Sequence, residues 1–145
     1  MNQSLYEAVG GRDAVLTLAH AWHRRCLADP LASHPFSHPD LHPQHTDRLA
    51  AYWAEAWGGP ALFTQTMGDE SRVVRLHAGN GEHPELDQRC IELFALALAD
   101  AGIPVDLRPT LEQYFREATK RMDRYPASPD DVPAGLPLPH WPPAE

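Results

Sequence analysis

Three histidines are the strongest candidates for chemistry in this sequence. His23, His45 and His77 each fall among apolar residues of a segment with helical periodicity, and the three segments are separate in the chain. A buried histidine needs a hydrogen-bond or metal partner for its ring nitrogens. One such residue is usually satisfied within a core, but three from separate helices favour a shared centre. Near neutral pH, imidazole serves there as a metal ligand or a proton carrier.

Two kinds of centre fit three imidazoles. One is a metal ion such as zinc, bound by three histidines with one position open. The other is a haem iron held by one histidine and faced by another. The spacing of the three histidines leaves both possibilities open. A haem would also explain the position of Arg75, because a cation two residues before His77 could meet a propionate.

A haem also needs broad apolar walls. The aromatic residues that could supply these walls, or could equally form a plain core, are Phe36, Tyr52, Trp53, Trp57, Phe63, Phe94 and Phe115. A mononuclear zinc site would leave this aromatic surplus unexplained.

The histidines outside these segments are expected to be solvent-exposed. His34, His38 and His42 alternate with prolines, which prevent a regular helix, so their spacing of four does not place them on one face. A histidine-rich metal tract is the alternative interpretation. His83 precedes Pro84 at a predicted helix start and is also expected to be exposed.

Composition excludes several classes of protein. The 145 residues suffice for about one domain, and the formal net charge of −8 argues against a nucleic-acid partner. Apolar stretches fall far short of the roughly 20 residues that span a bilayer, which argues against a membrane protein. Residues 1–10 lack the features of a signal peptide, so we expect a cytoplasmic protein. Cys26 and Cys90 are expected to be buried small apolar residues rather than a redox pair.

Helical periodicity accounts for most of the chain. Apolar residues recur at steps of three and four, and they predict helices over residues 11–28, 44–57, 69–77 and 84–101 and from Asp106 or Pro109 through Met122. The proline-rich residues 30–43 leave room only for a bent connection or single helical turns, and residues 61–63 are a short apolar loop. No segment alternates with period two over a useful length. The predicted fold class is all-α.

Prolines separate a tail from this helical body. Seven of the 15 prolines lie in the last 20 residues, where they prevent a helix. We therefore predict a helical domain over residues 1–125 and a proline-rich C-terminal tail over residues 126–145. The tail is either disordered or loosely docked, or it packs Leu136, Leu138 and Trp141 onto a groove of the body.

Short motifs in this order resemble the truncated haemoglobins. These motifs are LYEAVGG at 5–11, ADP at 28–30, WGGP at 57–60 and RLHA at 75–78, and the resemblance spans residues 4 to about 125. The paired glycines and the RLHA segment are most similar to group II of the family. The resemblance implies a two-over-two helical sandwich that binds haem b.

The resemblance also implies roles for individual residues. His77 would be the iron ligand, Arg75 would meet a propionate, and Phe36 and Phe63 would contact the haem. His45 and Leu49 would face the bound gas from the distal helix. Trp53 joins the expected cofactor-binding residues as one of the aromatic walls.

Two distal positions depart from the family pattern. His23 stands where most members have a tyrosine, and Cys90 stands where group II members have a tryptophan. Three alternatives follow for His45. It donates a hydrogen bond to bound dioxygen, it binds the iron directly, or its side chain swings out of the pocket. His23 could also donate the hydrogen bond to dioxygen.

We therefore expect a haem-binding globin that binds dioxygen or another diatomic gas at iron held by His77. Redox chemistry on oxygen, nitric oxide or peroxide, with a reductase as partner, would extend this function. The alternative is a non-haem helical metal-binding or interaction protein, in which His23, His45 and His77 form a zinc site or a polar core. The sequence leaves the oligomeric state open.

Overall fold

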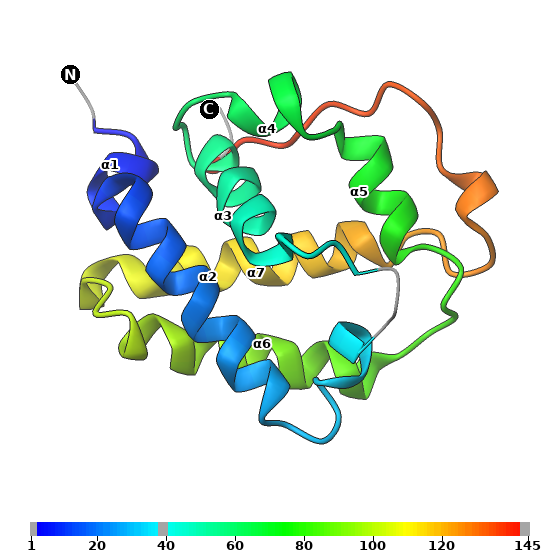
Figure 1. Ribbon diagram of the computed structural model, residues 1–145, viewed down its shortest axis with the longest axis horizontal. Helices are drawn as coiled ribbons and strands as arrows, with labels where there is room; N and C mark the ends of the chain where they lie inside the picture. Colours follow the sequence, from blue (N-terminus) through cyan, green and yellow to red (C-terminus); the bar gives the residue numbers. More distant parts are fainter. Residues whose placement is uncertain (1–2, 38–40, 143–145) are drawn as a thin grey trace.

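The computed structural model describes residues 3–37 and 41–142, and within these residues every regular element is helical. The all-α prediction is confirmed (Figure 1). The α-helices are α1 (Leu5–Val9), α2 (Gly11–Leu27), α3 (His45–Ala56), α4 (Leu62–Thr66), α5 (Glu70–His77), α6 (Pro84–Asp100) and α7 (Arg108–Met122). The 3-10 helices are η1 (His34–Ser37), η2 (Val105–Leu107) and η3 (Pro129–Asp131). His38 lies outside the described residues.

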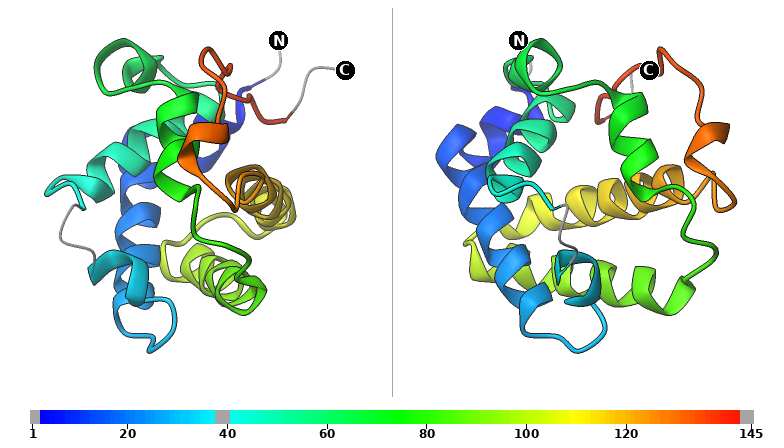
Figure 2. Two further views of the ribbon diagram at one scale, coloured as in Figure 1. Left: turned by 90° about the vertical axis from the view of Figure 1, so that its right-hand side faces the viewer. Right: turned by 45° about the vertical axis from the view of Figure 1, so that its right-hand side comes forward.

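The four long helices form two crossing pairs. Helix α2 packs against both α3 and α6, and α6 packs against α7. Figure 2 shows α6 and α7 side by side as one layer, with α2 and α3 in the other. Helix α5 is short and stands at one end, next to α7. This arrangement confirms the predicted two-over-two sandwich.

Aromatic side chains fill the centre of the sandwich. The rings of Trp53 and Trp57 stack with centroids 5.7 Å apart, and those of Phe94 and Phe115 stack at 4.3 Å. All four residues are buried in one continuous apolar core. Burial of such large side chains contributes most of the stability of a small domain.

Two short helices differ from the sequence prediction. Residues 61–63 were predicted as a loop, but residues 62 and 63 belong to α4 and Ala61 is its N-cap. In this helix the Thr64 backbone N–H and hydroxyl donate to the buried Glu55 carboxylate at 2.9 and 2.7 Å. Helix α1 was not predicted, and the Ser4 hydroxyl caps it by accepting from the Glu7 N–H. Five residues are too few for apolar periodicity to show, so polar side chains define these helices instead.

The proline-rich tail packs against the body. The Ser71 hydroxyl of α5 donates to the Pro133 carbonyl at 2.7 Å and accepts from the Leu136 N–H at 3.0 Å. Farther along, the Trp141 N–H donates to the last carbonyl of α3, that of Ala56. Leu138 and Trp141 join the main core, and Leu136 packs on a smaller cluster. The second of the two alternatives for the tail is therefore correct.

The tail covers one side of α5. Val132 packs with Val74 and Ala78 in a small apolar cluster, and the Tyr125 carbonyl accepts from the N–H of Gly79. Helix α5 is thus held between α7 and the tail (Figures 1 and 2).

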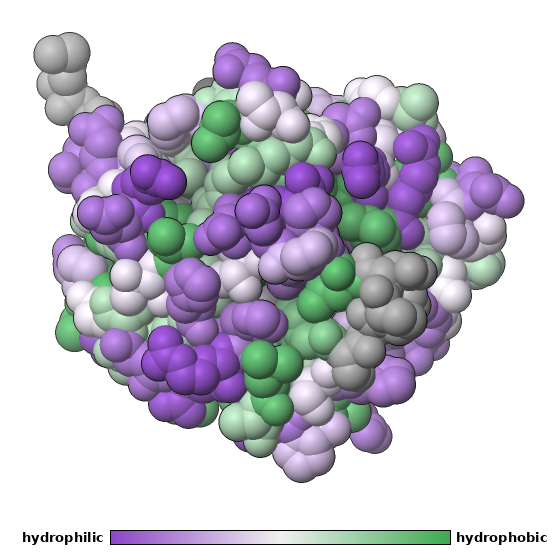
Figure 3. Space-filling view, viewed as in Figure 1, coloured by the Kyte–Doolittle hydropathy of each residue, from purple (hydrophilic) through white to green (hydrophobic). Residues whose placement is uncertain are grey.

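Exposed apolar side chains are dispersed over the surface. Figure 3 shows small apolar patches separated by polar residues on the face that it presents. Leu76 and Val105 are the most exposed of the large apolar residues, at 73% and 72%. Across the described ranges, no helix combines the length and apolar character needed to span a membrane.

Replacing Ser71 by alanine should loosen the tail from α5. The substitution leaves the Pro133 carbonyl and the Leu136 N–H without their common partner, so the free energy of unfolding should fall by roughly 1–3 kcal/mol. Urea unfolding of Ser71→Ala measures this loss. Thr17→Ala, at an exposed position of α2, is the control and should change stability by less than about 0.5 kcal/mol. Equal effects of the two substitutions would contradict a bracing role for the tail.

Candidate functional site

His77 is the last residue of α5, and its ring is held by its own helix. Its Nδ1 lies 2.8 Å from the Val73 carbonyl oxygen, one turn earlier. Because a carbonyl only accepts, Nδ1 carries the proton and Nε2 carries the lone pair. The helix starts at this register because the Asp69 side chain caps it by accepting from the Arg72 N–H. The local sequence thus presents one imidazole lone pair in a fixed orientation.

The surroundings of His77 combine access to solvent with a shell of nearby protein atoms. Its side chain is exposed to solvent, yet burial lowers its pKa, an effect that the bond to Val73 partly offsets. The two observations agree if protein atoms surround part of the ring while the edge with Nε2 stays accessible. A flat cofactor with a metal at its centre would suit this situation.

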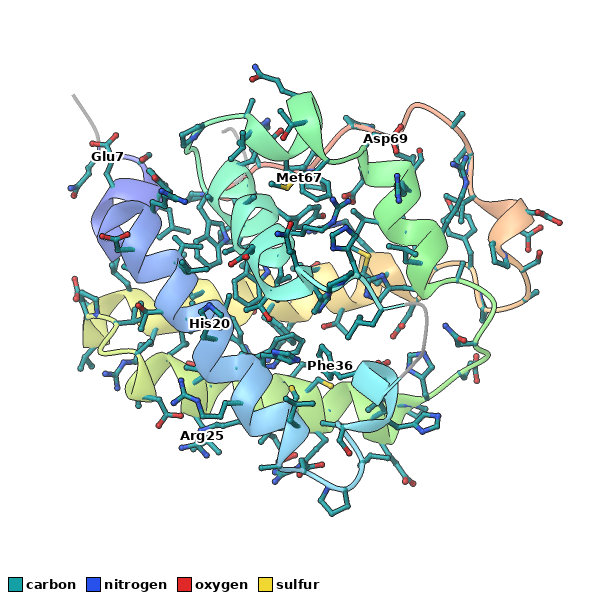
Figure 4. The ribbon with its side chains drawn as sticks, in the orientation of Figure 1. Glu7, His20, Arg25, Phe36, Met67 and Asp69 are labelled. Atoms are coloured by element: carbon teal, nitrogen blue, oxygen red, sulfur yellow. The ribbon has the colours of Figure 1, made fainter. Side chains whose placement is uncertain are left out.

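Two further histidines form a cluster with Phe36. The rings of His23 on α2 and His45 on α3 have centroids 6.0 Å apart. Phe36, on η1, lies 5.0 Å from the His23 ring and 5.5 Å from the His45 ring. Figure 4 shows where η1 brings Phe36 toward α2, whereas His20 lies on the outward face of that helix.

Electrostatic effects connect this cluster to His77. Burial, together with the smaller effects of the nearby His23 and His77, lowers the pKa of His45 to about 4. Burial also lowers the pKa of His23, with a smaller effect of His20. The structure therefore places His45 within electrostatic reach of both His23 and His77, and it favours neutral imidazoles at pH 7.

Thr46 is a residue of this site that the sequence analysis missed. Its hydroxyl lies 2.9 Å from His23 Nδ1, and its side chain is buried. This contact fixes the orientation of the His23 ring and leaves Nε2 for the pocket. The sequence signal that could have identified Thr46 is its place directly after His45, on the buried side of the predicted helix.

The other predicted cofactor-binding residues take different positions. Leu49 is half-buried against the core, Phe63 is buried edge-to-face with Tyr52, and Trp53 is buried in the aromatic stack. Arg75 is exposed, and its Nη2 donates to the Val132 carbonyl of the tail at 3.3 Å. A propionate contact for Arg75 stays a prediction.

The two cysteines are not equivalent. Cys26 is buried as expected, but Cys90 is only half-buried. A hydrogen bond between the two thiols lowers the pKa of Cys90 and raises that of Cys26. The Trp22 indole N–H donates to the Cys90 carbonyl at 3.2 Å. This indole N–H is therefore already bonded to α6.

A buried contact sets the position of α5 relative to α3. The Tyr52 hydroxyl of α3 donates to Glu70 Oε1 at the start of α5, at 2.5 Å. Burial raises the pKa values of both groups. The helix that carries His45 and the helix that carries His77 are thus joined directly by a short hydrogen bond.

The remaining described histidines are mostly exposed, as predicted: His20, His34, His42 and His140. His83 contradicts its prediction. It is half-buried and bonds to Asp87, because the loop before α6 folds its ring inward.

A cavity of about 270 Å³ among α1, α2, α3 and α4 has none of the three clustered histidines in its lining.

This fold and histidine arrangement define a helical protein of the globin class. A model of the family described as bacterial-like globin matches residues 4–123. The chain therefore belongs to the bacterial-like globin family. No functionally curated protein matches the sequence closely.

Solved haemoglobin structures have the same architecture. The chain is similar to haemoglobin from the thermophilic phototrophic bacterium Chloroflexus aurantiacus, with 27% identity and a TM-score of 0.72 over 85% of this chain and 99% of that one. It is similar to a thermostable haemoglobin from Thermobifida fusca, with 26% identity and a TM-score of 0.68 over 92% and 100% of the chains. Group II truncated haemoglobin from Bacillus anthracis, with 19% identity and a TM-score of 0.74 over 88% and 96%, shares the fold. The predicted similarity to truncated haemoglobins is confirmed.

The depressed pKa of His45 makes a prediction for acid stability. Its pKa is about 4 in the folded chain and near 6.5 when unfolded, so protons bind the unfolded state preferentially between these values. The contribution of neutral His45 to the free energy of unfolding should be fully present above pH 6.5 and should decrease as the pH falls toward 4. In the haem-free chain His45→Gln should reduce this loss by roughly 1–3 kcal/mol, as measured by urea unfolding at pH 7 and pH 4.5. An identical loss in both proteins would contradict the burial of His45.

Proposed function

We propose that the chain binds haem b through His77 and holds dioxygen or another diatomic gas next to His23 and His45. The observation that carries this proposal is the Nδ1 contact of His77 with the Val73 carbonyl. Ligating histidines usually donate their second ring nitrogen to a carbonyl or carboxylate, and that bond selects the ligating tautomer. Membership of the globin family supports the same assignment.

The chemistry of the residues assigned to the site fits a haem. His77 would provide the fifth iron ligand, and Phe36, Leu49 and Phe63 would supply apolar contacts. Arg75, which is exposed near the end of α5, would exchange its 3.3 Å bond to the tail for a propionate. We propose residues 1–125 as the haem domain and residues 126–145 as a brace on α5.

Bound haem supplies a ferrous iron that binds diatomic gases reversibly. The chain supplies the environment. A neutral His45 has one N–H to donate to a partly negative gas atom. His23 has a second when the Thr46 hydroxyl donates to its Nδ1, because the ring proton is then on Nε2. Apolar walls keep water away from these donors, which strengthens each hydrogen bond.

Redox chemistry on oxygen, nitric oxide or peroxide extends the proposal. His23 and His45 could relay protons from solvent to a reduced ligand, and a reductase would supply the electrons. The rival assignment, a zinc site or polar core built from the same three histidines, requires a colourless protein, whereas a haem protein has an intense Soret band.

Replacing His77 by alanine should abolish most haem binding. The variant lacks the only imidazole on α5, whereas His140→Ala, in the exposed tail, keeps it and serves as the control. Haem per chain is measured after reconstitution and gel filtration. We expect about one haem in the wild type and the control and a small fraction in His77→Ala. Full retention by His77→Ala would refute the assignment.

Replacing His45 by leucine should weaken the retention of dioxygen. Loss of a hydrogen bond to a partly charged acceptor costs about 1.5–3 kcal/mol, so the dissociation rate should rise roughly tenfold or more. Stopped-flow displacement of dioxygen by carbon monoxide measures the rate. His140→Leu should leave it unchanged. If His45→Leu also leaves it unchanged, while His23→Leu raises it, the donor is His23 and our assignment of His45 fails.

A further inference from the structure

A second group of metal-ligating side chains lies outside the histidine pocket. His83 precedes α6, Asp87 lies one turn into α6, and Asp123 follows α7. His83 Nδ1 is 2.8 Å from Asp87 Oδ1, and His83 Nε2 is 3.7 Å from Asp123 Oδ1. One ligand atom from each of the three residues lies within 4.8 Å of the other two.

These side chains surround a small cavity with access to solvent. Its volume is about 260 Å³, and its lining includes Glu82 as well as the three ligand residues. The three side chains are 21–32% exposed, so they are neither sealed in the core nor free on the surface. An ion with one or two waters can therefore enter.

The backbone around the cavity is held in place. The Gly81 N–H donates to the Pro126 carbonyl at 2.9 Å, which joins the loop before α6 to the segment after α7. Because His83 and Asp87 come from one side of this junction and Asp123 from the other, the three ligands keep their separation without an ion.

The charges of the group favour a cation. Asp87 and Asp123 are close enough to share a hydrogen bond, and burial together with this bond raises the pKa of Asp123 to about 7. Two adjacent carboxylates repel each other when both are ionised. A divalent ion between them removes this repulsion and replaces the shared proton.

We propose that His83, Asp87 and Asp123 bind a divalent transition-metal ion, with Zn²⁺ as the best-fitting species. One imidazole nitrogen and two carboxylate oxygens suit zinc, and Glu82 or water would complete a tetrahedral set. The imidazole disfavours Mg²⁺ and Ca²⁺, which prefer oxygen ligands. His83 and Asp87 also influence the pKa of His77, so an ion here would act electrostatically on the histidine assigned to the iron.

Isothermal titration of the full, haem-loaded chain with zinc chloride tests this site. We expect one zinc ion per chain, with no competition from excess magnesium or calcium. Asp123→Asn and His83→Ala should each weaken zinc binding by roughly tenfold or more, because loss of a direct ligand should cost at least as much as loss of an outer-shell partner. Asp130→Asn and His140→Ala, matched changes at exposed tail positions, should keep the wild-type affinity.

Zinc-induced thermal stabilisation provides the second readout. Zinc should raise the Tm of the wild type but not that of a folded variant that cannot bind zinc. A variant that does not fold shows no thermal transition, and Asp87→Asn is then tested in place of that variant. Absence of zinc binding in the wild type, or wild-type affinity in Asp123→Asn, would overturn the proposal. If the chain proves haem-free, the titration is run on His77→Ala, so that zinc at the clustered histidines does not obscure the result.

Discussion

The hydrogen bond between His77 and the Val73 carbonyl is the interaction on which the proposed site depends. It orients the ring and reserves Nε2 for a ligand, but it exists only while α5 is helical. Eight residues are too few for a helix that is stable alone. Packing must therefore maintain α5, through the Tyr52 bond to Glu70 on one side and the Ser71 bonds to the tail on the other. The distant proline-rich tail thus supports the histidine that defines the site.

The cluster of His23, His45 and Phe36 combines polar side chains with apolar surroundings. Burial keeps His23 and His45 neutral, and a neutral imidazole offers one donor and one acceptor. Phe36 packs on both rings, and Thr46 engages one of them. In the proposed site, His23 therefore offers a neutral imidazole where the family resemblance implies a tyrosine, and Cys90 offers a thiol where it implies a tryptophan.

The sequence predicted the long helices because each buries an apolar stripe over three or more turns. It failed for α1 and α4, where Ser4 and Glu55 act through single polar contacts that no periodicity reveals. His77 could be identified from its motif, and its contact with Val73 follows from helical spacing. The inward position of His83 could not be predicted from the sequence. Its partner Asp123 is 40 residues away, and the two side chains meet only through the packing of α6 and α7.

Resonance Raman spectroscopy of the reduced chain tests the central claim most directly. If His77 holds the iron, the ferrous protein will show an iron–histidine stretching band that shifts when histidine is labelled with ¹⁵N. That band will be lost in His77→Gly and restored by added imidazole, which can occupy the vacated space as a free ligand. A chain without haem absorption, or a histidine-sensitive band that persists unchanged in His77→Gly, would contradict the account.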